Sequence, residues 1–184
     1  MSRKPTFNVV VVYDDFYSAL RAQELAGRMA AELEPVFVLR TEVWNFELAT
    51  HADLCDRAAK DAIEADMVII SASTGEDLPS GVKGWMQSWL PQKRGGLAAL
   101  VALVNWPAGR GADTPPAAAS LRQMAKASGM DFFCRTGRPR EDSFSYAFGS
   151  VHRQGVGSRV VPGGIAYSGP AWRGHGQRWL GVAE

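Results

Sequence analysis

Residues 7–13, FNVVVVY, form a continuous apolar, β-branched run between Pro5 and the pair Asp14-Asp15. This composition is typical of a strand that is buried on both faces of a parallel sheet. The chain then changes to helical spacing over residues 18–33, where apolar side chains recur every three to four positions until Pro35. A buried strand followed directly by an amphipathic helix indicates the start of a strand–helix–strand unit.

The same alternation continues through the first 134 residues. Further strands are predicted at residues 36–39, 67–70, 97–104 and 131–134, and further helices at residues 51–65, 80–90 and 116–128. A connection that carries Trp44 and Phe46 is expected after the second strand. No hairpin signal interrupts the pattern, so it predicts an α/β protein with a parallel sheet and helices on both faces. Five strands suit the doubly wound order 2-1-3-4-5, in which ligands bind at the strand carboxyl ends.

Residues 135–184 break this pattern. The segment is rich in Gly and carries seven Arg and no Lys against three acidic residues, together with scattered aromatic side chains. We therefore predict a doubly wound α/β domain at 1–134 and an irregular C-terminal extension at 135–184. Because disordered segments are poor in aromatic residues, the extension is expected to pack on the domain or on a partner subunit. Arg with aromatics also suits stacking on single-stranded bases, but it is typical of subunit interfaces, so we expect a homo-oligomer rather than a nucleic-acid partner.

The bulk composition excludes several classes of protein. The 184 residues are 46% hydrophobic and 21% charged, with a formal net charge of +1, which gives no basis for a polyelectrolyte partner. No segment approaches the roughly 20 apolar residues of a membrane span, and the apolar run near the start is too short for a signal peptide. The two cysteines, Cys55 and Cys134, belong to no C-x-x-C pair. A reducing cytoplasm is therefore the expected compartment.

Four stretches between Ala65 and Phe133 carry a resemblance to a known family: ADMVIIS, LPSGVKGWMQSWL, LAALVALVNWPAGRG and SLRQMAKASGMDFF. They resemble the NADPH-dependent FMN reductases of the flavodoxin-like fold. That family has Pro-Gly-x-Leu-Lys before a helix with a Trp, and Pro79, Val82 and Lys83 match the Pro, Leu and Lys. Trp89 comes one residue later than the family's Trp would. The resemblance implies a flavodoxin-like fold with FMN as cofactor and NADPH as reductant.

The resemblance also assigns roles to individual residues. Ser18 and Arg21 would lie near the FMN phosphate at the start of the first helix, where free amides and the helix dipole favour an anion. Ser73, Thr74 and Gly75 would lie along the flavin ring, although such residues are also common in any loop. Trp106 would stack on the ring or, equally, cap the edge of the sheet. Two departures accompany these roles. The chain has Ala72 to Gly75 where the family has Pro-Glu-Tyr-Asn, and the two aspartates before Ser18 oppose a phosphate.

The pair Asp14-Asp15 has readings of its own. Two carboxylates at a strand end indicate a divalent-metal site, a hydrogen-bonding clamp at the crevice or simple compensation of the helix dipole. A metal is not expected as a cofactor. The pair also looks like the acidic pair of response-regulator receiver domains. A working receiver needs an Asp after strand three and a Lys after strand five, and this chain has Ser71-Ala72-Ser73 and Cys134-Arg135 there. Phosphotransfer is therefore not expected.

Two functions remain open from the sequence. The first is a flavodoxin-like protein similar to NADPH-dependent FMN reductases, with a flavin in a modified site at the strand carboxyl ends. The flavin would carry the chemistry, so no side chain is predicted to be catalytic. The second is a non-catalytic interaction or regulatory module on a flavodoxin-like or receiver-like scaffold that has lost the cofactor. Fold alone does not decide between them.

Overall fold

The structure, a computed structural model, describes residues 4–93, 98–106, 114–137, 160–161 and 165–167. Its elements are, in chain order, β1 (Thr6–Tyr13), α1 (Phe16–Leu33), β2 (Val38–Asn45), α2 (Phe46–Thr50), α3 (Cys55–Glu64), β3 (Met67–Ala72), α4 (Ser80–Trp89), the 3-10 helix η1 (Leu90–Lys93), β4 (Ala99–Val104), α5 (Pro116–Ser128), β5 (Asp131–Thr136), β6 (Val160–Val161) and β7 (Ile165–Tyr167). The predicted alternation of strands and helices is confirmed.

The sheet has the predicted strand order. Parallel pairing joins β1 to β2 and β3, β3 to β4, and β4 to β5. This is the 2-1-3-4-5 order of the flavodoxin-like fold. Two short strands extend the sheet beyond β2: β7 lies parallel to β2, and β6 pairs antiparallel with β7. Both belong to the extension that was predicted to be irregular, and its other residues, 138–159, 162–164 and 168–184, lie outside the described part of the chain.

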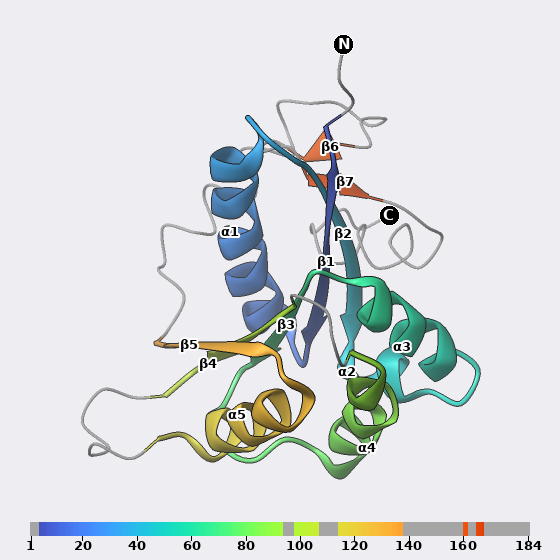
Figure 1. Ribbon diagram of the computed structural model, residues 1–184. Helices are drawn as coiled ribbons and strands as arrows, with labels where there is room; N and C mark the ends of the chain where they lie inside the picture. Colours follow the sequence, from blue (N-terminus) through green and yellow to red (C-terminus); the bar gives the residue numbers. More distant parts are fainter. Residues whose placement is uncertain (1–3, 94–97, 107–113, 138–159, 162–164, 168–184) are drawn as a thin grey trace, which may run out of the picture.

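Helices cover both faces of the sheet (Figure 1): α1 lies on one face, and α3, α4 and α5 lie on the other. The continuous apolar run of β1 supplies both faces, because alternate side chains point to opposite sides. Val9 and Val11 belong to the cluster under α1, whereas Val10 and Val12 belong to the cluster under the other helices. Trp85 and Trp89 of α4 are buried in the second cluster, as their helical spacing predicts.

The second strand is longer than predicted, and a short helix follows it directly. β2 continues through Trp44 to Asn45, where a connection was expected, and the Asn45 side chain accepts a hydrogen bond of 2.7 Å from Leu48 N to start α2. The buried Trp44 indole donates to Asp61 Oδ2 at 3.1 Å. The sequence of β2 alternates polar and apolar residues because the strand is only partly buried, so it lacks the continuous run that marks β1.

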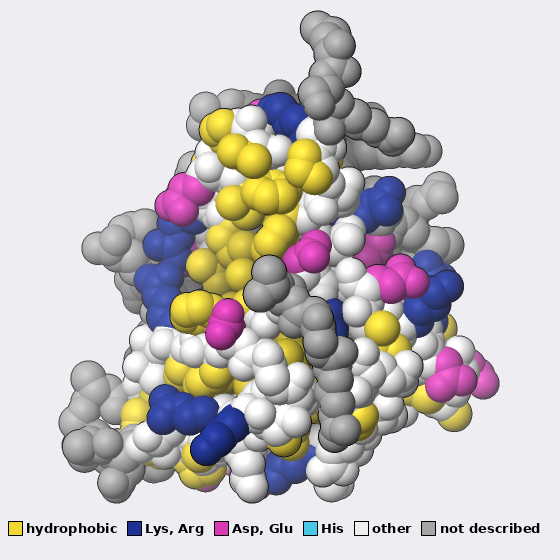
Figure 2. Space-filling view, in the orientation of Figure 1, with side chains coloured by type: hydrophobic (Ala, Val, Ile, Leu, Met, Phe, Trp, Pro, Cys, Tyr) yellow, Lys and Arg dark blue, Asp and Glu magenta, His cyan; other side chains and the backbone are white. Residues whose placement is uncertain are grey.

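The face under α1 becomes exposed toward β5. One row of side chains crosses the sheet from Val11 through Ile69 and Val101 to Phe133. Val11 is 1% exposed, but Phe133 on the edge strand is 57% exposed. Apolar side chains also gather over α1 and the strands beside it (Figure 2). Such a surface is compatible with the expected homo-oligomer, which stays a prediction.

The described residues carry no disulfide: Cys55 and Cys134 are both free. Burial raises the pKa of the Cys134 thiol, although much of the residue is exposed at the edge of the sheet. No helix in the described ranges is long and apolar enough to span a membrane. The cytoplasmic compartment stays a prediction.

Candidate functional site

The carboxyl ends of β1, β3 and β4 bring three loops together. We call the residues there the strand-end site: Asp14, Asp15, Ser73, Thr74, Gly75 and Trp106. Two backbone hydrogen bonds extend the sheet into these loops, from Asp14 N to Ser71 O at 3.3 Å and from Asn105 N to Ala72 O at 3.2 Å. Residues that are up to 92 positions apart in the sequence therefore meet at one edge, because parallel neighbours end on the same side.

Asp14 and Ser73 join the loop after β1 to the loop after β3. Ser73 N donates to Asp14 Oδ1 at 2.9 Å and to Oδ2 at 2.7 Å, and the Ser73 hydroxyl donates to Oδ2 at 2.7 Å. Hydrogen bonds to an ionised carboxylate are stronger than neutral ones. Both donors of Ser73 are therefore held by a carboxylate of the chain itself.

Asp15 and Ser18 cap the start of α1. Ser18 N donates to Asp15 Oδ1 at 2.8 Å, and the Ser18 hydroxyl accepts from Asp15 N at 3.0 Å and from Asp14 N at 3.2 Å. This reciprocal arrangement is a capping box, which satisfies amides that a helix N-terminus otherwise leaves without partners. Ser18 is only 1% exposed. Its predicted contact with a phosphate stays a prediction. The Ser18 side chain bonds within this loop, and its carbonyl oxygen accepts from the Ser71 hydroxyl of β3 at 2.7 Å.

Arg21 lies one turn further along α1 and is 7% exposed. Nη2 donates to Ala72 O at 2.5 Å, to Leu103 O at 3.2 Å and to Ser71 Oγ at 3.5 Å, and Nη1 donates to Gly137 O at 3.0 Å. Burial lowers the pKa of the guanidinium, while the nearby aspartates 14 and 15 raise it. Arg21 thus fastens the ends of β3, β4 and β5 to α1, a role that the sequence did not indicate. Its predicted phosphate contact stays a prediction.

Gly75 and Trp106, both predicted to contact a ligand ring, contact each other. A Cβ at position 75 would lie 2.1 Å from Trp106 Cε3 and 3.1 Å from the Pro115 side chain, so only glycine fits. Gly75 O also accepts from Ala117 N at 3.2 Å at the start of α5. The half-buried Trp106 is held against this loop, in which the exposed Thr74 directly precedes Gly75.

Asp77 organises the chain between β3 and α4, and the sequence analysis missed it. Its carboxylate pairs with Lys83 Nζ, accepts from the Ser120 hydroxyl at 2.9 Å and accepts from Leu78 N at 3.0 Å. The hydrogen bond from Lys83, followed by that from Ser120, lowers the pKa of Asp77. The lysine that matches the family motif is therefore paired within the chain.

Two exposed aromatic residues at the same edge were also missed. Phe16 and Tyr17 start α1 and are 36% and 56% exposed, with ring centroids 5.9 Å apart at 74°. Large apolar side chains left in solvent beside a loop cluster often mark a binding surface. The signal was present in the sequence, since two aromatics directly follow the Asp14-Asp15 pair.

The carboxylates of Asp14 and Asp15 bond to serines within the strand-end site. Across the described residues, no group of three or more His, Cys, Asp or Glu side chains could hold a metal ion. The metal assignment of Asp14 and Asp15 stays a prediction, and their described partners are Ser73 and Ser18.

The donors present also do not fit the phosphate of FMN. A phosphate needs N–H and O–H donors that face it, and here two carboxylates accept the donors at the ends of β1 and β3. The guanidinium of Arg21 below them donates to backbone carbonyls.

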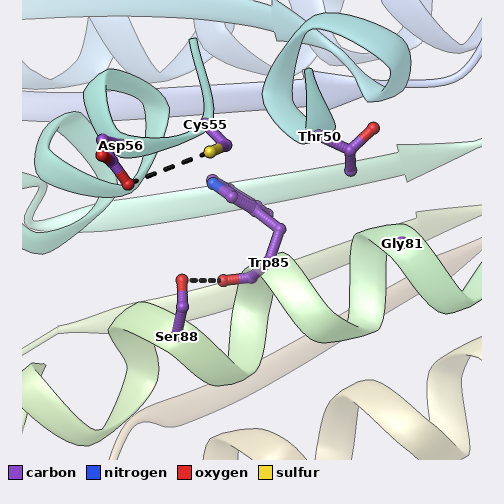
Figure 3. A pocket seen from close by; sticks show the side chains of 6 residues that line it. All are labelled: Thr50, Cys55, Asp56, Gly81, Trp85 and Ser88. Carbon is purple, nitrogen blue, oxygen red and sulfur yellow. Dashed lines mark hydrogen bonds between the residues drawn. The ribbon is translucent and has the colours of Figure 1, made fainter. Parts of the chain in front are cut away.

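A separate pocket of about 280 Å³ lies between helices on the other face of the sheet (Figure 3), lined by Thr50, Cys55, Asp56, Gly81, Trp85 and Ser88. The nitrogen of the Trp85 indole points toward Cys55 and has no hydrogen-bond partner, whereas Cys55 Sγ lies 3.9 Å from Asp56 Oδ1. The lining contains none of the predicted site residues. This pocket is therefore distinct from the strand-end site.

The chain is similar to several solved structures. A short-chain flavodoxin associated with a non-canonical PDU bacterial microcompartment has a TM-score of 0.47 at 12% identity, with 75% of this chain and 89% of that chain covered. Rubredoxin oxygen:oxidoreductase from Desulfovibrio gigas has a TM-score of 0.45 at 18% identity, with 78% and 34% covered. The Trp repressor binding protein from Bacillus subtilis has a TM-score of 0.44 at 10% identity, with 74% and 89% covered.

No family model and no curated protein matches the sequence. The flavodoxin-like fold follows from the chain's own strand order and layers. At these identities, the similarity to solved structures assigns no ligand and no activity to the chain.

Proposed function

We propose that the chain is a flavin-binding protein of the flavodoxin-like fold, with the flavin ring at the strand-end site. The observation that carries the proposal is the grouping of aromatic side chains around the loops there. Phe16 and Tyr17 are exposed beside the loop after β1, and Trp106 lies against the loop after β3. Aromatic faces bind planar rings by offset stacking, and strand carboxyl ends are where doubly wound sheets bind ligands.

The roles proposed for the loop after β3 follow from its exposure. Thr74 is exposed and Ser73 is half-buried, so both can meet a ring that lies over the loop, while Gly75 holds the loop close to Trp106. A bound flavin carries hydride or electrons itself, so the protein's task is to hold and orient the ring. FMN and NADPH, which the resemblance implies, stay predictions under this proposal.

The experiment is a flavin titration of the purified protein. The visible spectrum is recorded first, and FMN and riboflavin are then added separately while their fluorescence is followed. Binding is expected to quench the emission, because a ring stacked on an aromatic side chain loses fluorescence. Tyr17→Ser should weaken this quenching, and Phe133→Ser, which removes an exposed aromatic from the β5 edge, should not. A colourless protein that leaves the emission of both flavins unchanged would refute the proposal.

A second function is favoured by a different observation. Asp14 satisfies both donors of Ser73, and Asp15 satisfies Ser18 N, so these loops are closed without any ligand. Closed loops suit an interaction module that has kept the scaffold and lost the cofactor. Under this alternative, neither wild type nor Tyr17→Ser would change the fluorescence of the added flavins. Tyr17→Ser would instead weaken association with a partner subunit, which light scattering would detect as a lower mass.

A further inference from the structure

The strand-end site contains its own anions at the places where a phosphate would find donors. Asp15 Oδ1 accepts the amide of Ser18 at the N-terminus of α1, and Asp14 accepts the amide and hydroxyl of Ser73 at the end of β3. A helix N-terminus binds a phosphate through free amides that point at it. A phosphate would have to displace two carboxylates to reach these donors.

The guanidinium of Arg21 beneath these loops already bonds to the chain. Arg21 is buried beneath the loops, and its two Nη atoms donate to the carbonyl oxygens of Ala72, Leu103 and Gly137. Turning the guanidinium toward a phosphate would leave these carbonyls without that donor. Buried acceptors that lose a partner are costly, so this rearrangement is disfavoured.

The other charged residues nearby leave the edge acidic. Glu76 and Asp77 follow Gly75 and add to Asp14 and Asp15. Against these four acids stand three cations: Arg21, Lys83, which is paired with Asp77, and Arg135 at the end of β5, which lies close enough to Arg21 to lower its pKa. Counted over the described residues alone, the local balance is thus negative.

We infer that the strand-end site selects a flavin without its phosphate, and that Asp14 is the residue that determines this specificity. The inference rests on the proposed flavin function and names its ligand class: an uncharged, planar ring system with riboflavin as its probe. The ring can lie on the aromatic side chains, while the ribityl hydroxyls can donate to the Asp14 carboxylate that would repel a phosphate. A carboxylate accepts hydrogen bonds from hydroxyls and repels anions, so Asp14 alone can bind the ribityl chain and disfavour the phosphate.

The size of the discrimination follows from the charges. A phosphate monoester carries close to two negative charges, and placing them about 6 Å from one carboxylate in water weakens binding roughly tenfold. The wild-type protein is therefore expected to bind riboflavin about tenfold more tightly than FMN. Asp14→Asn keeps an oxygen that Ser73 can donate to but removes the charge, so it should reduce this ratio to near one by strengthening FMN binding.

The test compares both flavins on three proteins by fluorescence titration: wild type, Asp14→Asn and Asp131→Asn. Asp131 is exposed at the start of β5, at the opposite end of the strands, so its replacement makes the same change in net charge far from the site. It should leave the ratio unchanged. A higher salt concentration should also bring the ratio of the wild-type affinities for riboflavin and FMN closer to one, because salt screens charges near the surface.

The outcomes separate the inference from the proposed function. Both the inference and the proposed function are supported if wild type prefers riboflavin, Asp14→Asn removes this preference and Asp131→Asn keeps it. If wild type binds FMN as tightly as riboflavin or more tightly, the inference is overturned while the flavin function stands. If neither flavin binds any of the three proteins, the proposed function fails and the inference fails with it. The wild-type comparison needs no variant, so it holds even if Asp14→Asn does not fold.

Discussion

Replacing Arg21 by methionine is expected to lower the free energy of unfolding by about 3 kcal/mol. The guanidinium donates to Gly137 O at 3.0 Å, Ala72 O at 2.5 Å and Leu103 O at 3.2 Å, which join α1 to the ends of three strands. Methionine fills much of the same volume, so the change removes the donors while leaving little cavity. The loss should therefore report the hydrogen bonds rather than the packing.

The magnitude is the difference of two terms. Hydrogen bonds to a charged group contribute about 1.5 kcal/mol or more each, and three carbonyls lose one. Burial also disfavours the charged guanidinium, as its lowered pKa indicates, and relief from that burial offsets part of the loss. A net loss of about 3 kcal/mol is a large share of the roughly 5–15 kcal/mol that stabilises a typical domain. The thermal midpoint should fall by roughly 6–12 °C.

The assay is urea unfolding followed by circular dichroism and by tryptophan fluorescence. Arg28→Met is the matched control, because Arg28 lies on the same helix, is about half exposed and pairs with Glu24 at 3.7 Å. That surface pair should contribute about 0.3–0.5 kcal/mol. If Arg21→Met were no less stable than Arg28→Met, the carbonyl bonds would not hold the strand ends together, and our account of Arg21 would be wrong.

Two further predictions concern other buried contacts. Asp61→Asn should unfold at a higher urea concentration than wild type near neutral pH, and the difference should vanish as the pH falls toward about 4. Burial raises the folded-state pKa of Asp61. The contribution of Asp61 to stability is therefore present in acid and is lost as the pH rises through that pKa. Equal urea midpoints at neutral pH would contradict this. Gly75→Ala should lose roughly 1–3 kcal/mol by thermal unfolding, because its Cβ would overlap the Trp106 ring, whereas Gly84→Ala, with nothing within 4 Å, should gain roughly 0.5–1 kcal/mol. A tolerated Gly75→Ala would mean that Trp106 moves freely.

The sequence predicted the layers of the fold because the spacing of apolar residues indicates which faces of the strands and helices are buried. The run at residues 7–13 could only suit a strand buried on both faces, and it became the central β1. Trp85 and Trp89 lie four residues apart on one helix face, a spacing that is typical of core packing or of a subunit interface, and both are buried in the core. The end of β2 and the whole of α2 were missed, because a partly exposed strand alternates its residues and a five-residue helix is too short to show a period.

The candidate site was predicted only in outline. Sequence order places Asp14, Ser73 and Trp106 at the ends of three strands, and the topology then brings those ends together. It does not say which side chains bond across the loops. The Asp14–Ser73 contact spans 59 residues and the Arg21–Gly137 contact spans 116, and no local pattern encodes either of them.

By itself, then, the sequence determined the strand–helix alternation and the parallel sheet, and it placed the candidate site residues at the ends of three strands, because these depend on periodicity and chain order. Only the tertiary structure decided what each polar residue does there. It turned Arg21 inward to backbone carbonyls and Asp14 across to Ser73, since a buried or half-buried polar group bonds to whatever partner the packing brings within reach. Those long-range partners already occupy donors that the phosphate of FMN would need.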